Sequence, residues 1–339
     1  MKKFLVTGAS GFLGTHLVER LKTQAQHDPD GLSVRVLSRK KTRWEGDPKL
    51  EIVCGDILDP QAVDRAVAGV SGIFHLAGSV TRDPAQAAGL FDTHIRGTRN
   101  LCESARAHGS PRMIIASSSG TLAVSRKPIL HTEDSPYSYE ITGHWPYYLS
   151  KICQEKLALS YHAHHSLPVI VMNPSLLLGP GDEKNSSSGD IQMFLDGFAS
   201  NIPNGGMNFV DVRDAADAFI RAMQLGVPGR RYLLGGHNMT VHEFFQLIER
   251  VTGVRGPRVR LPENWARRGA AILRRIYGWL GRSFPIDDCT VEMAYRFWYI
   301  DNTRAHSELR FTPRPAEDTI RDTVEFLRSR KSPAPGKQP

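Results

Sequence analysis

Tyr147 and Lys151 are the residues of this chain whose types and spacing most directly suggest proton chemistry. They lie four positions apart in the segment Pro146–Lys151, and Pro146 suits the first turn of a helix, so the two side chains should share one helical face. A phenol with an unperturbed pKa of about 10 carries protons poorly at neutral pH, but a nearby ammonium favours the phenolate and lowers that pKa. The pair could therefore protonate or deprotonate a substrate oxygen.

A run of three serines, Ser117–Ser119, strengthens this interpretation because it follows an apolar stretch that predicts a strand at 112–117. A hydroxyl at the end of that strand would face the same crevice and could hold the substrate oxygen. The simpler alternatives are a polar turn for the serines and a chance surface pair for Tyr147 and Lys151. The patterns together favour a catalytic group.

The segment Thr7–Gly14 places Gly8, Gly11 and Gly14 between an apolar run and a helix-like run at 15–21. Glycines allow a tight turn and a close approach, and a helix start offers free N–H groups at its positive end. This arrangement is typical of a site for the pyrophosphate of a dinucleotide, although its first gap is one residue wider than the usual fingerprint. A tight strand–helix connection is the alternative. A nicotinamide bound there would exchange hydride with the substrate carbon while Tyr147 moves the proton.

Short apolar runs alternate with helical patterns through the first half of the chain. Such alternation implies right-handed crossovers and an α/β fold, a doubly wound parallel Rossmann sheet whose ligand lies beyond the carboxyl ends of the strands. The predicted strands are 3–7, 33–38, 50–54, 72–76, 112–117 and 168–173, and the predicted helices include 60–68, 95–108 and 147–164.

The alternation weakens after Pro174, where strands are predicted at 208–212 and 231–234 and helices at 190–199, 214–224 and 241–252. We therefore expect a dinucleotide-binding domain at 1–175 and a smaller C-terminal substrate-binding domain at 176–330. A strand and a helix between 208 and 238 could return to the first domain. The segment 331–339, rich in Pro, Gly and Lys, predicts a disordered tail.

The end of the second predicted strand selects between the two nicotinamide dinucleotides, because an acid there binds a ribose 2′-hydroxyl whereas an arginine receives a 2′-phosphate. Ser38 is followed here by three cations, Arg39 to Lys41, with no acid in reach. We therefore predict NADP(H) in preference to NAD(H), with Arg39 as the main contact. A solvated basic loop is the alternative. Asp56, at the end of the third strand, could accept a hydrogen bond from the adenine amino group.

These motifs occur in a fixed order: Thr7-Gly8-x-x-Gly11-x-x-Gly14, Gly55-Asp56, His75-Leu76-Ala77, Gly97-Thr98-x-Asn100, the serine run, Tyr147-x-x-x-Lys151 and Asn173-Pro174. As a set they resemble the extended short-chain dehydrogenase/reductases, the NAD(P)-dependent epimerase/dehydratase superfamily, from Met1 to about Phe326. Within that superfamily the chain is most similar to the branch that holds dihydroflavonol reductases, 3β-hydroxysteroid dehydrogenases and hopanoid-associated epimerase-like proteins.

The resemblance implies a catalytic Ser/Tyr/Lys triad, with the serine at Ser118 and Ser119 as the alternative. It further implies that Lys151 binds the nicotinamide ribose, and that the protein is a homodimer. The cofactor contacts predicted from the motifs and the resemblance together are Thr7, Gly8, Gly11, Phe12, Leu13, Gly14, Ser38, Arg39, Asp56, Ile57, Leu76, Ala77, Gly78, Tyr147, Lys151, Asn173 and Pro174.

Two positions depart from the family pattern. His94 stands where the family usually has an asparagine that supports a structural or proton-relay network. Relatives that act on nucleotide sugars commonly carry Arg-Asp-Phe before a later strand ends, and that arginine grips the sugar nucleotide's pyrophosphate. The corresponding residues here are Met207-Asn208-Phe209. The loss of this cation argues against a nucleotide-sugar substrate.

Composition places the chain among ordinary globular proteins, with 339 residues of which 40% are hydrophobic and 23% charged. No apolar run approaches the roughly 18 residues of a membrane-spanning helix, and the first one ends too soon for a signal peptide. The four cysteines are far apart, which favours reduced thiols and a cytoplasmic location. No aromatic interleaving or binding motif suggests nucleic acid, and His162, His164 and His165 lack companions at metal-ligand spacing.

The formal charge of +8 is concentrated between Arg255 and Arg282, where eight arginines accompany one acid, Glu263. On a helix over 265–282, six apolar residues gather on one side and five arginines on another. The ordinary expectation is that the apolar stripe packs on the core of the substrate domain. The alternative is a basic amphipathic helix that rests on an anionic membrane.

We therefore expect an NADP(H)-dependent oxidoreductase that interconverts a ketone or aldehyde and an alcohol on a small, fairly apolar molecule. One alternative is a sugar or nucleotide-sugar epimerase or dehydratase, in which a tightly bound cofactor returns hydride to the same substrate. A second is a non-catalytic NADP(H)-sensing protein, which would not require Tyr147.

Overall fold

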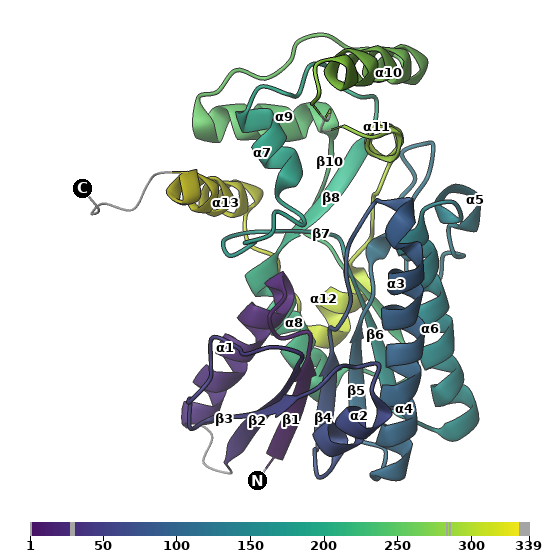
Figure 1. Cartoon of the computed structure of the whole chain (residues 1–339), viewed down its shortest axis with the longest axis vertical. Coiled ribbons are helices and arrows are strands. Elements are labelled where there is room, and N and C mark those ends of the chain that lie inside the picture. The colour runs from purple at the N-terminus through teal and green to yellow at the C-terminus, as the bar shows by residue number, and fades with distance from the viewer. Residues whose placement is uncertain (1, 28–30, 283, 285, 332–339) are drawn as a thin grey trace.

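The computed structural model describes residues 2–27, 31–282, 284 and 286–331, and its elements form the layers seen in Figure 1. The central sheet has seven strands in the order β3-β2-β1-β4-β5-β6-β9, and neighbouring strands run parallel. Their bounds are β1 (Lys2–Thr7), β2 (Leu32–Ser38), β3 (Leu50–Cys54), β4 (Gly72–His75), β5 (Arg112–Ala116), β6 (Val169–Pro174) and β9 (Arg231–Leu234). The prediction of a doubly wound parallel Rossmann sheet is thus confirmed.

Helices cover both faces of this sheet, which is why its strands are almost continuously apolar. One face packs on α1 (Phe12–His27), α8 (Val212–Leu225) and α12 (Thr303–Leu309). The other packs on α2 (Pro60–Val67), α4 (Gly97–Ala107) and α6 (Pro146–His165). The strand order reverses between β1 and β4, so a ligand is expected beyond the carboxyl ends of these two strands.

A second, smaller sheet has the order β10-β8-β7, built from β7 (Leu176–Leu178), β8 (Gly206–Asp211) and β10 (His237–Thr240). A separate apolar core lies beside it, formed with α7 (Gly189–Leu195), α9 (Val241–Thr252) and α13 (Ala316–Lys331). The short helices α3 (Ala87–Phe91) and α5 (Tyr139–Thr142) lie close to α6. The expected tail at 331–339 lies outside the described residues, except for Lys331 at the end of α13.

The predicted strands of the first half agree with the structure to within a residue or two, but α1 extends six residues beyond the predicted end at Leu21, and α3 and α5 were not predicted. The helix predicted at 95–108 is two elements, a π-helical turn at Asp92–Arg96 followed by α4. The helix predicted at 190–199 ends earlier, at Leu195, and the short strands β7 and β10 were not predicted.

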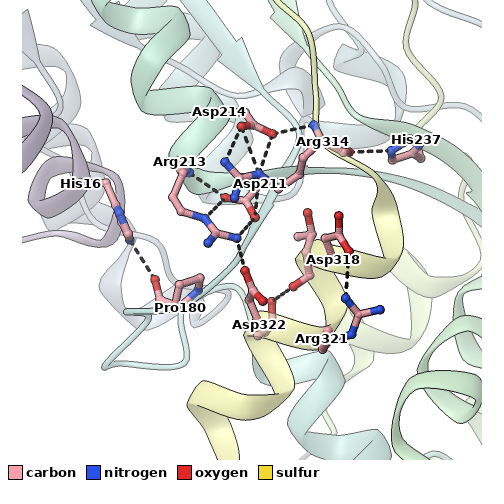
Figure 2. A network of polar contacts seen from close by, with 12 residues as sticks. His16, Pro180, Asp211, Arg213, Asp214, His237, Arg314, Asp318, Arg321 and Asp322 are labelled. Carbon is pink, nitrogen blue, oxygen red and sulfur yellow. Dashed lines mark hydrogen bonds and ion pairs between the residues drawn. The ribbon is translucent and has the colours of Figure 1, made fainter.

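An ion-pair network ties the C-terminal helix to the start of α8 (Figure 2). Asp211 caps α8 by accepting from the backbone N–H of Arg213 at 2.9 Å, and its carboxylate also receives the Arg213 guanidinium at 2.8 and 2.7 Å. The same guanidinium reaches Asp322 of α13 at 2.6 Å, while Arg314 pairs with Asp214 at 2.7 Å. These pairs hold the residues after 310 against the carboxyl end of β8.

The arginine-rich stretch forms α10 (Glu263–Trp279), which packs on α11 (Asp288–Ala294). The expectation that its apolar stripe packs on the core is wrong, because Ala270 is the only residue of α10 that is fully buried. Trp265, Ile272 and Trp279 are instead exposed. No helix among the described residues has the length and apolarity needed to cross a membrane.

Candidate active site

Ser118, Tyr147 and Lys151 come together at the carboxyl end of the parallel sheet. Ser118 lies two residues beyond the end of β5. Tyr147 and Lys151 lie one turn apart at the start of α6. Burial raises the pKa of Tyr147 to about 12, while the adjacent Ser118 side chain acts in the opposite direction. Ser119 is buried in the short 3-10 turn that follows, so Ser118 is the serine beside the phenol.

The Lys151 ammonium is buried and points at the sheet. Its Nζ atom donates to the carbonyl of Ala116 at 2.8 Å and to Oε1 of Gln154 at 2.9 Å. Burial lowers the pKa of Lys151 to about 7, although the nearby Glu155 carboxylate favours its charged form. The expectation that the ammonium lowers the Tyr147 pKa is not met in this structure, because burial of the phenol has the larger effect.

A chain of buried polar groups connects Lys151 to the glycine segment. Gln154 donates from Nε2 to the Thr98 hydroxyl at 2.9 Å, which lies 2.9 Å from Nε2 of His75. Nδ1 of His75 lies 2.9 Å from the Thr7 hydroxyl, and Thr7 in turn accepts from the backbone N–H of Ala77 at 3.2 Å. Burial lowers the His75 pKa to about 3, so the chain is uncharged at neutral pH.

His94 lies in the π-helical turn against the start of α6. Its Nδ1 atom is 2.8 Å from the Ser150 hydroxyl, and its Nε2 atom is buried with no hydrogen-bond partner among the described residues. Burial, with a contribution from Lys151, lowers the pKa of His94 to about 2. A Cβ on Gly78 would lie 2.7 Å from Nε2 of His94, so only glycine lets the backbone pass there.

A second buried group supports Ser118 from behind. The Asn173 amide donates to the Ser118 carbonyl at 3.1 Å and to Oε1 of Glu155 at 2.6 Å, while its Oδ1 atom is buried and has no hydrogen-bond partner in the described part of the chain. The Thr121 hydroxyl also donates to Glu155, at 2.8 Å. Asn173 and Pro174 are the last two residues of β6. The hydrogen bonds of Asn173 therefore fix the turn that carries Ser118.

Sequence reasoning did not single out Ser150, Gln154 or Glu155 as site residues. These three polar side chains are buried on the side of α6 that faces the sheet, on the same helix as Lys151. Their positions on the face of Lys151 were the feature of the sequence that could have identified them. Such groups require hydrogen-bond partners, and here those partners are the predicted catalytic and cofactor residues.

The glycine segment folds as a cradle at the start of α1. Gly8 has φ +71°, and a Cβ there would meet the backbone of Leu76 and Ala77 at 2.5 Å. A Cβ on Gly14 would lie 2.2 Å from the Gly8 carbonyl, whereas a Cβ on Gly11 would meet only that carbonyl, at 3.2 Å. Gly8 and Gly14 are therefore needed by the fold. Gly11 is exposed at the start of the helix, and the packing around it does not require a glycine in the way that it does at the other two positions.

Phe12 and Leu13, the two residues after Gly11, differ in burial. Leu13 is buried in the core, and Phe12 is partly buried with an edge-on contact to His16. His16 lies 2.8 Å from the carbonyl of Pro180, so the loop at 179–181 borders this helix start (Figure 2).

The residues predicted for the adenosine end also lie together. One guanidinium nitrogen of Arg39 is 3.8 Å from Oδ2 of Asp56, and the Arg39 side chain is 76% exposed. The Ser38 hydroxyl turns back to the carbonyl of Lys40 at 2.9 Å. Ile57 is buried, and a Cβ on Gly97 would press on it at 3.0 Å. The expectation that no acid is in reach of Arg39 is therefore wrong, because the segment that follows the third strand supplies Asp56.

Aromatic side chains line one side of Tyr147. Its ring centroid is 5.0 Å from that of Tyr148, which lies 5.4 Å from Trp298. Trp298 stacks on Trp145 with centroids 5.8 Å apart. A Cβ on Gly120 would collide with the Tyr148 ring at 2.2 Å, so glycine at this position makes room for the aromatic group.

The fold and this site define a class of nucleotide-dependent enzymes, and comparison with known families agrees. Residues 4–235 match the NAD dependent epimerase/dehydratase family, and the chain belongs to that family. The resemblance to extended short-chain dehydrogenase/reductases is thus confirmed, and the protein is an NAD(P)-dependent enzyme of this superfamily.

Individual relatives cover nearly the whole chain. A putative dihydroflavonol 4-reductase of Synechocystis sp. is 29% identical over 96% of this chain and 94% of its own length. Sterol demethylase protein B of Methylococcus capsulatus is 28% identical, covering 96% of this chain and 98% of its own. Among solved structures, gox2253 is 28% identical, with a TM-score of 0.79 over 98% of this chain and 99% of that chain.

Proposed function

We propose that this protein is an NADP(H)-dependent oxidoreductase that interconverts a carbonyl group and an alcohol on a small, fairly apolar substrate. The observation that carries the proposal is the meeting of Ser118, Tyr147 and Lys151 beyond the carboxyl ends of the strands, beside the glycine cradle. The aromatic side chains next to Tyr147 support an apolar substrate.

A nicotinamide dinucleotide held at this site would supply or accept the hydride. The Ser118 hydroxyl, which hydrogen-bonds with the Tyr147 side chain, would hold the substrate oxygen beside the phenol. In the reductive direction, Tyr147 gives its proton to that oxygen as the carbonyl carbon gains hydride, and in the oxidative direction the phenolate takes the alcohol proton. The Lys151 ammonium favours the phenolate in the charged form of the site and holds the ribose.

Two groups would hold the two ends of NADP(H). Gly8, Gly11 and Gly14 with the N-terminus of α1 form the pyrophosphate cradle, with Phe12 and Leu13 in its first turn. Arg39 is exposed and able to receive a 2′-phosphate, which supports NADP(H) over NAD(H). Asp56 would face the adenine, and Leu76, Ala77 and Gly78 would border the ribose and nicotinamide.

The nucleotide-sugar alternative is disfavoured by the position where relatives carry a gripping arginine. Met207 stands at that position, and its side chain is partly buried against the apolar core beside the smaller sheet. It offers no cation to a pyrophosphate. Net cofactor turnover separates the two functions, because an epimerase consumes none.

The decisive experiment is a panel of ketones, aldehydes and alcohols, including aromatic and steroid-like members, scored by NADPH absorbance and run in parallel with NADH. We expect turnover with at least one apolar carbonyl compound and a preference for NADPH. Tight NADP(H) binding without turnover on any substrate would favour the sensing alternative. The homodimer implied by the resemblance is part of this proposal and is tested by light scattering.

A further inference from the structure

We propose that α10 lies flat on the surface of an anionic membrane. Its outward side carries Trp265, Ile272, Ile276 and Trp279, whose side chains are 63%, 58%, 47% and 87% exposed. These residues recur at the spacing of one helical face, with Leu273 and Leu280 at its edge. Large apolar groups gathered on one exposed helix face indicate an interaction surface rather than scattered surface residues.

The folded protein already uses the opposite side of α10. Ala270 packs against Val291 and Tyr295, joined by the partly buried Ala266. The apolar part of this contact comes from two small side chains of α10, Ala266 and Ala270, and the large apolar residues face outward. The apolar stripe expected to build the core is therefore on the wrong side of the helix to do so.

The arginines of α10 divide into two sets with different environments. Arg267 pairs with Glu263 at 3.0 Å and Arg274 with Asp288 at 2.5 Å, so their charges are used inside the fold. Arg268 and Arg275 are exposed and lie beside the apolar face, and within the described residues neither makes an ion pair. The Arg268 guanidinium lies 5.7 Å from the Trp265 ring, on the same outward side.

The combination of positive charge and apolar side chains on the exposed face of α10 indicates what binds there. The single acid of α10, Glu263, points inward to Arg267 and Arg296. A second copy placed face to face on α10 would bring its own Arg268 and Arg275 to these arginines without a carboxylate to balance them, which opposes association. An anionic bilayer supplies both an apolar interior and negative headgroups, and basic amphipathic helices lie in such interfaces.

The position of α10 suits a flat surface. It lies across one end of the molecule, at the far end from the central sheet, and the segment between α9 and α10 runs at the same end (Figure 1). Trp265 and Trp279 are 14 positions apart on this helix, which is about 21 Å along its axis. Val259 and Leu261, in the segment that leads into α10, are also exposed. Tryptophans at both ends of the face match the preference of this residue for membrane interfaces.

The surface is connected to the candidate active site through α11. Arg82 donates to the Thr290 hydroxyl at 2.8 Å, His144 lies 3.0 Å from Glu292, and Trp298 beyond α11 stacks on Trp145. Membrane contact at α10 would thus hold the substrate side of the protein near the bilayer. The inference does not depend on the proposed reaction.

The test is co-sedimentation of the full chain with vesicles of phosphatidylcholine alone and of phosphatidylcholine and phosphatidylglycerol in equal parts. Two exposed arginines are neutralised in Arg268→Gln/Arg275→Gln, and the apolar face is altered in Ile272→Glu/Trp279→Glu. The matched control, Lys49→Gln/Arg65→Gln, removes the same net charge from exposed positions near the central sheet. Arg274 is left intact because its loss would break the contact with Asp288.

We expect the wild type to bind the anionic vesicles and the Arg268/Arg275 variant to show a partition coefficient roughly 30-fold lower, because two arginines leave the surface. The Ile272/Trp279 variant should not sediment, and the control should bind like the wild type. Absence of wild-type binding, or equal losses in the control, would overturn the proposal. So would a wild-type oligomer that the Ile272/Trp279 variant dissociates, because a second copy would then cover α10. Turnover of a water-soluble substrate should be the same in all variants.

Discussion

The Ser150 hydroxyl joins His94 to the backbone of Tyr147. It donates to the Tyr147 carbonyl at 2.7 Å, and its oxygen lies 2.8 Å from Nδ1 of His94. A hydroxyl has one hydrogen, so Ser150 accepts from the Nδ1–H of a neutral His94. Nε2 of His94 is then a bare acceptor beside Gly78. The residue that replaces the family's asparagine thus helps to fix the first turn of α6.

Ser150→Ala should lower the free energy of unfolding by about 1–3 kcal/mol, because the buried Nδ1–H of His94 loses its acceptor. Urea denaturation measures this change. Ser160→Ala is the matched control, since Ser160 on the same helix donates to the Leu157 carbonyl at 2.7 Å but is only partly buried and has no such second partner among the described residues. It should cost less than about 1 kcal/mol. Equal losses in the two variants would contradict this account of His94.

Tyr147→Phe should lower kcat by about 10²–10⁴-fold, the range expected when a positioned proton donor is removed. The affinity for NADP(H), measured by fluorescence titration, should change little because the ring remains. Tyr161→Phe on the far part of α6, whose hydroxyl donates to Glu103 at 2.5 Å, is the control and should keep normal turnover. If Tyr147→Phe retains activity, Tyr147 is not the residue that transfers the proton.

Lys151 predicts a dependence of stability on pH in the protein without cofactor. Its pKa falls from 10.5 to about 7 on folding, mainly through burial. Between these values the unfolded chain holds a proton that the folded protein lacks, so stability rises with pH and this gain is lost as the pH falls toward 7. As the pH rises from 7.5 to 9.5, the unfolding free energy of the wild type should therefore increase relative to that of Lys151→Met, by at most about 1.4 kcal/mol per pH unit. A flat difference from pH 7.5 to 9.5 would count against a neutral buried amine.

The fold was predictable where apolar runs are long and buried on both faces. The strands predicted at 72–76 and 168–173 match β4 and β6 to within one residue, and every residue of these two strands is buried. The strands β7 and β10 have three and four residues and pair only with β8, so their stability comes from tertiary contacts that periodicity does not reveal.

The sequence predicted which residues the structure brings together at the candidate site, but it did not predict their electrostatics. Spacing brought Tyr147 and Lys151 to one helical face, yet burial rather than their mutual distance dominates both pKa values. The acid near Arg39 is Asp56, which lies two residues beyond the end of β3, and its approach depends on the twist and register of the sheet. For α10, periodicity identified an apolar face but could not tell which side meets α11.

The two outer glycines of the cradle and the central one should respond differently to a methyl group. Gly8→Ala should destabilise the fold strongly, since φ is +71° and the Cβ would meet backbone at 2.5 Å. Gly11→Ala should cost about 1 kcal/mol or less, as for an exposed glycine in an ordinary conformation. Its NADP(H) dissociation constant, measured by calorimetry, should rise at least about tenfold, equivalent to 1.4 kcal/mol. An unchanged dissociation constant would show that the pyrophosphate does not approach Gly11.

Arg39 should determine the choice between the two cofactors. Arg39→Ala removes a charge-assisted contact, and such contacts contribute about 1.5–3 kcal/mol, so kcat/KM with NADPH should fall roughly 10–100-fold while the value with NADH changes little. Arg43→Ala is the matched control in the same loop, because Arg43 is paired with Glu183 at 2.9 Å and should leave the ratio unchanged. The ion-pair partner Asp56 lies 3.8 Å from Arg39, so Asp56→Asn should free the guanidinium and increase the preference for NADPH. If neither Arg39→Ala nor Asp56→Asn changes the ratio of kcat/KM with NADPH to kcat/KM with NADH, the 2′-phosphate does not bind at Arg39.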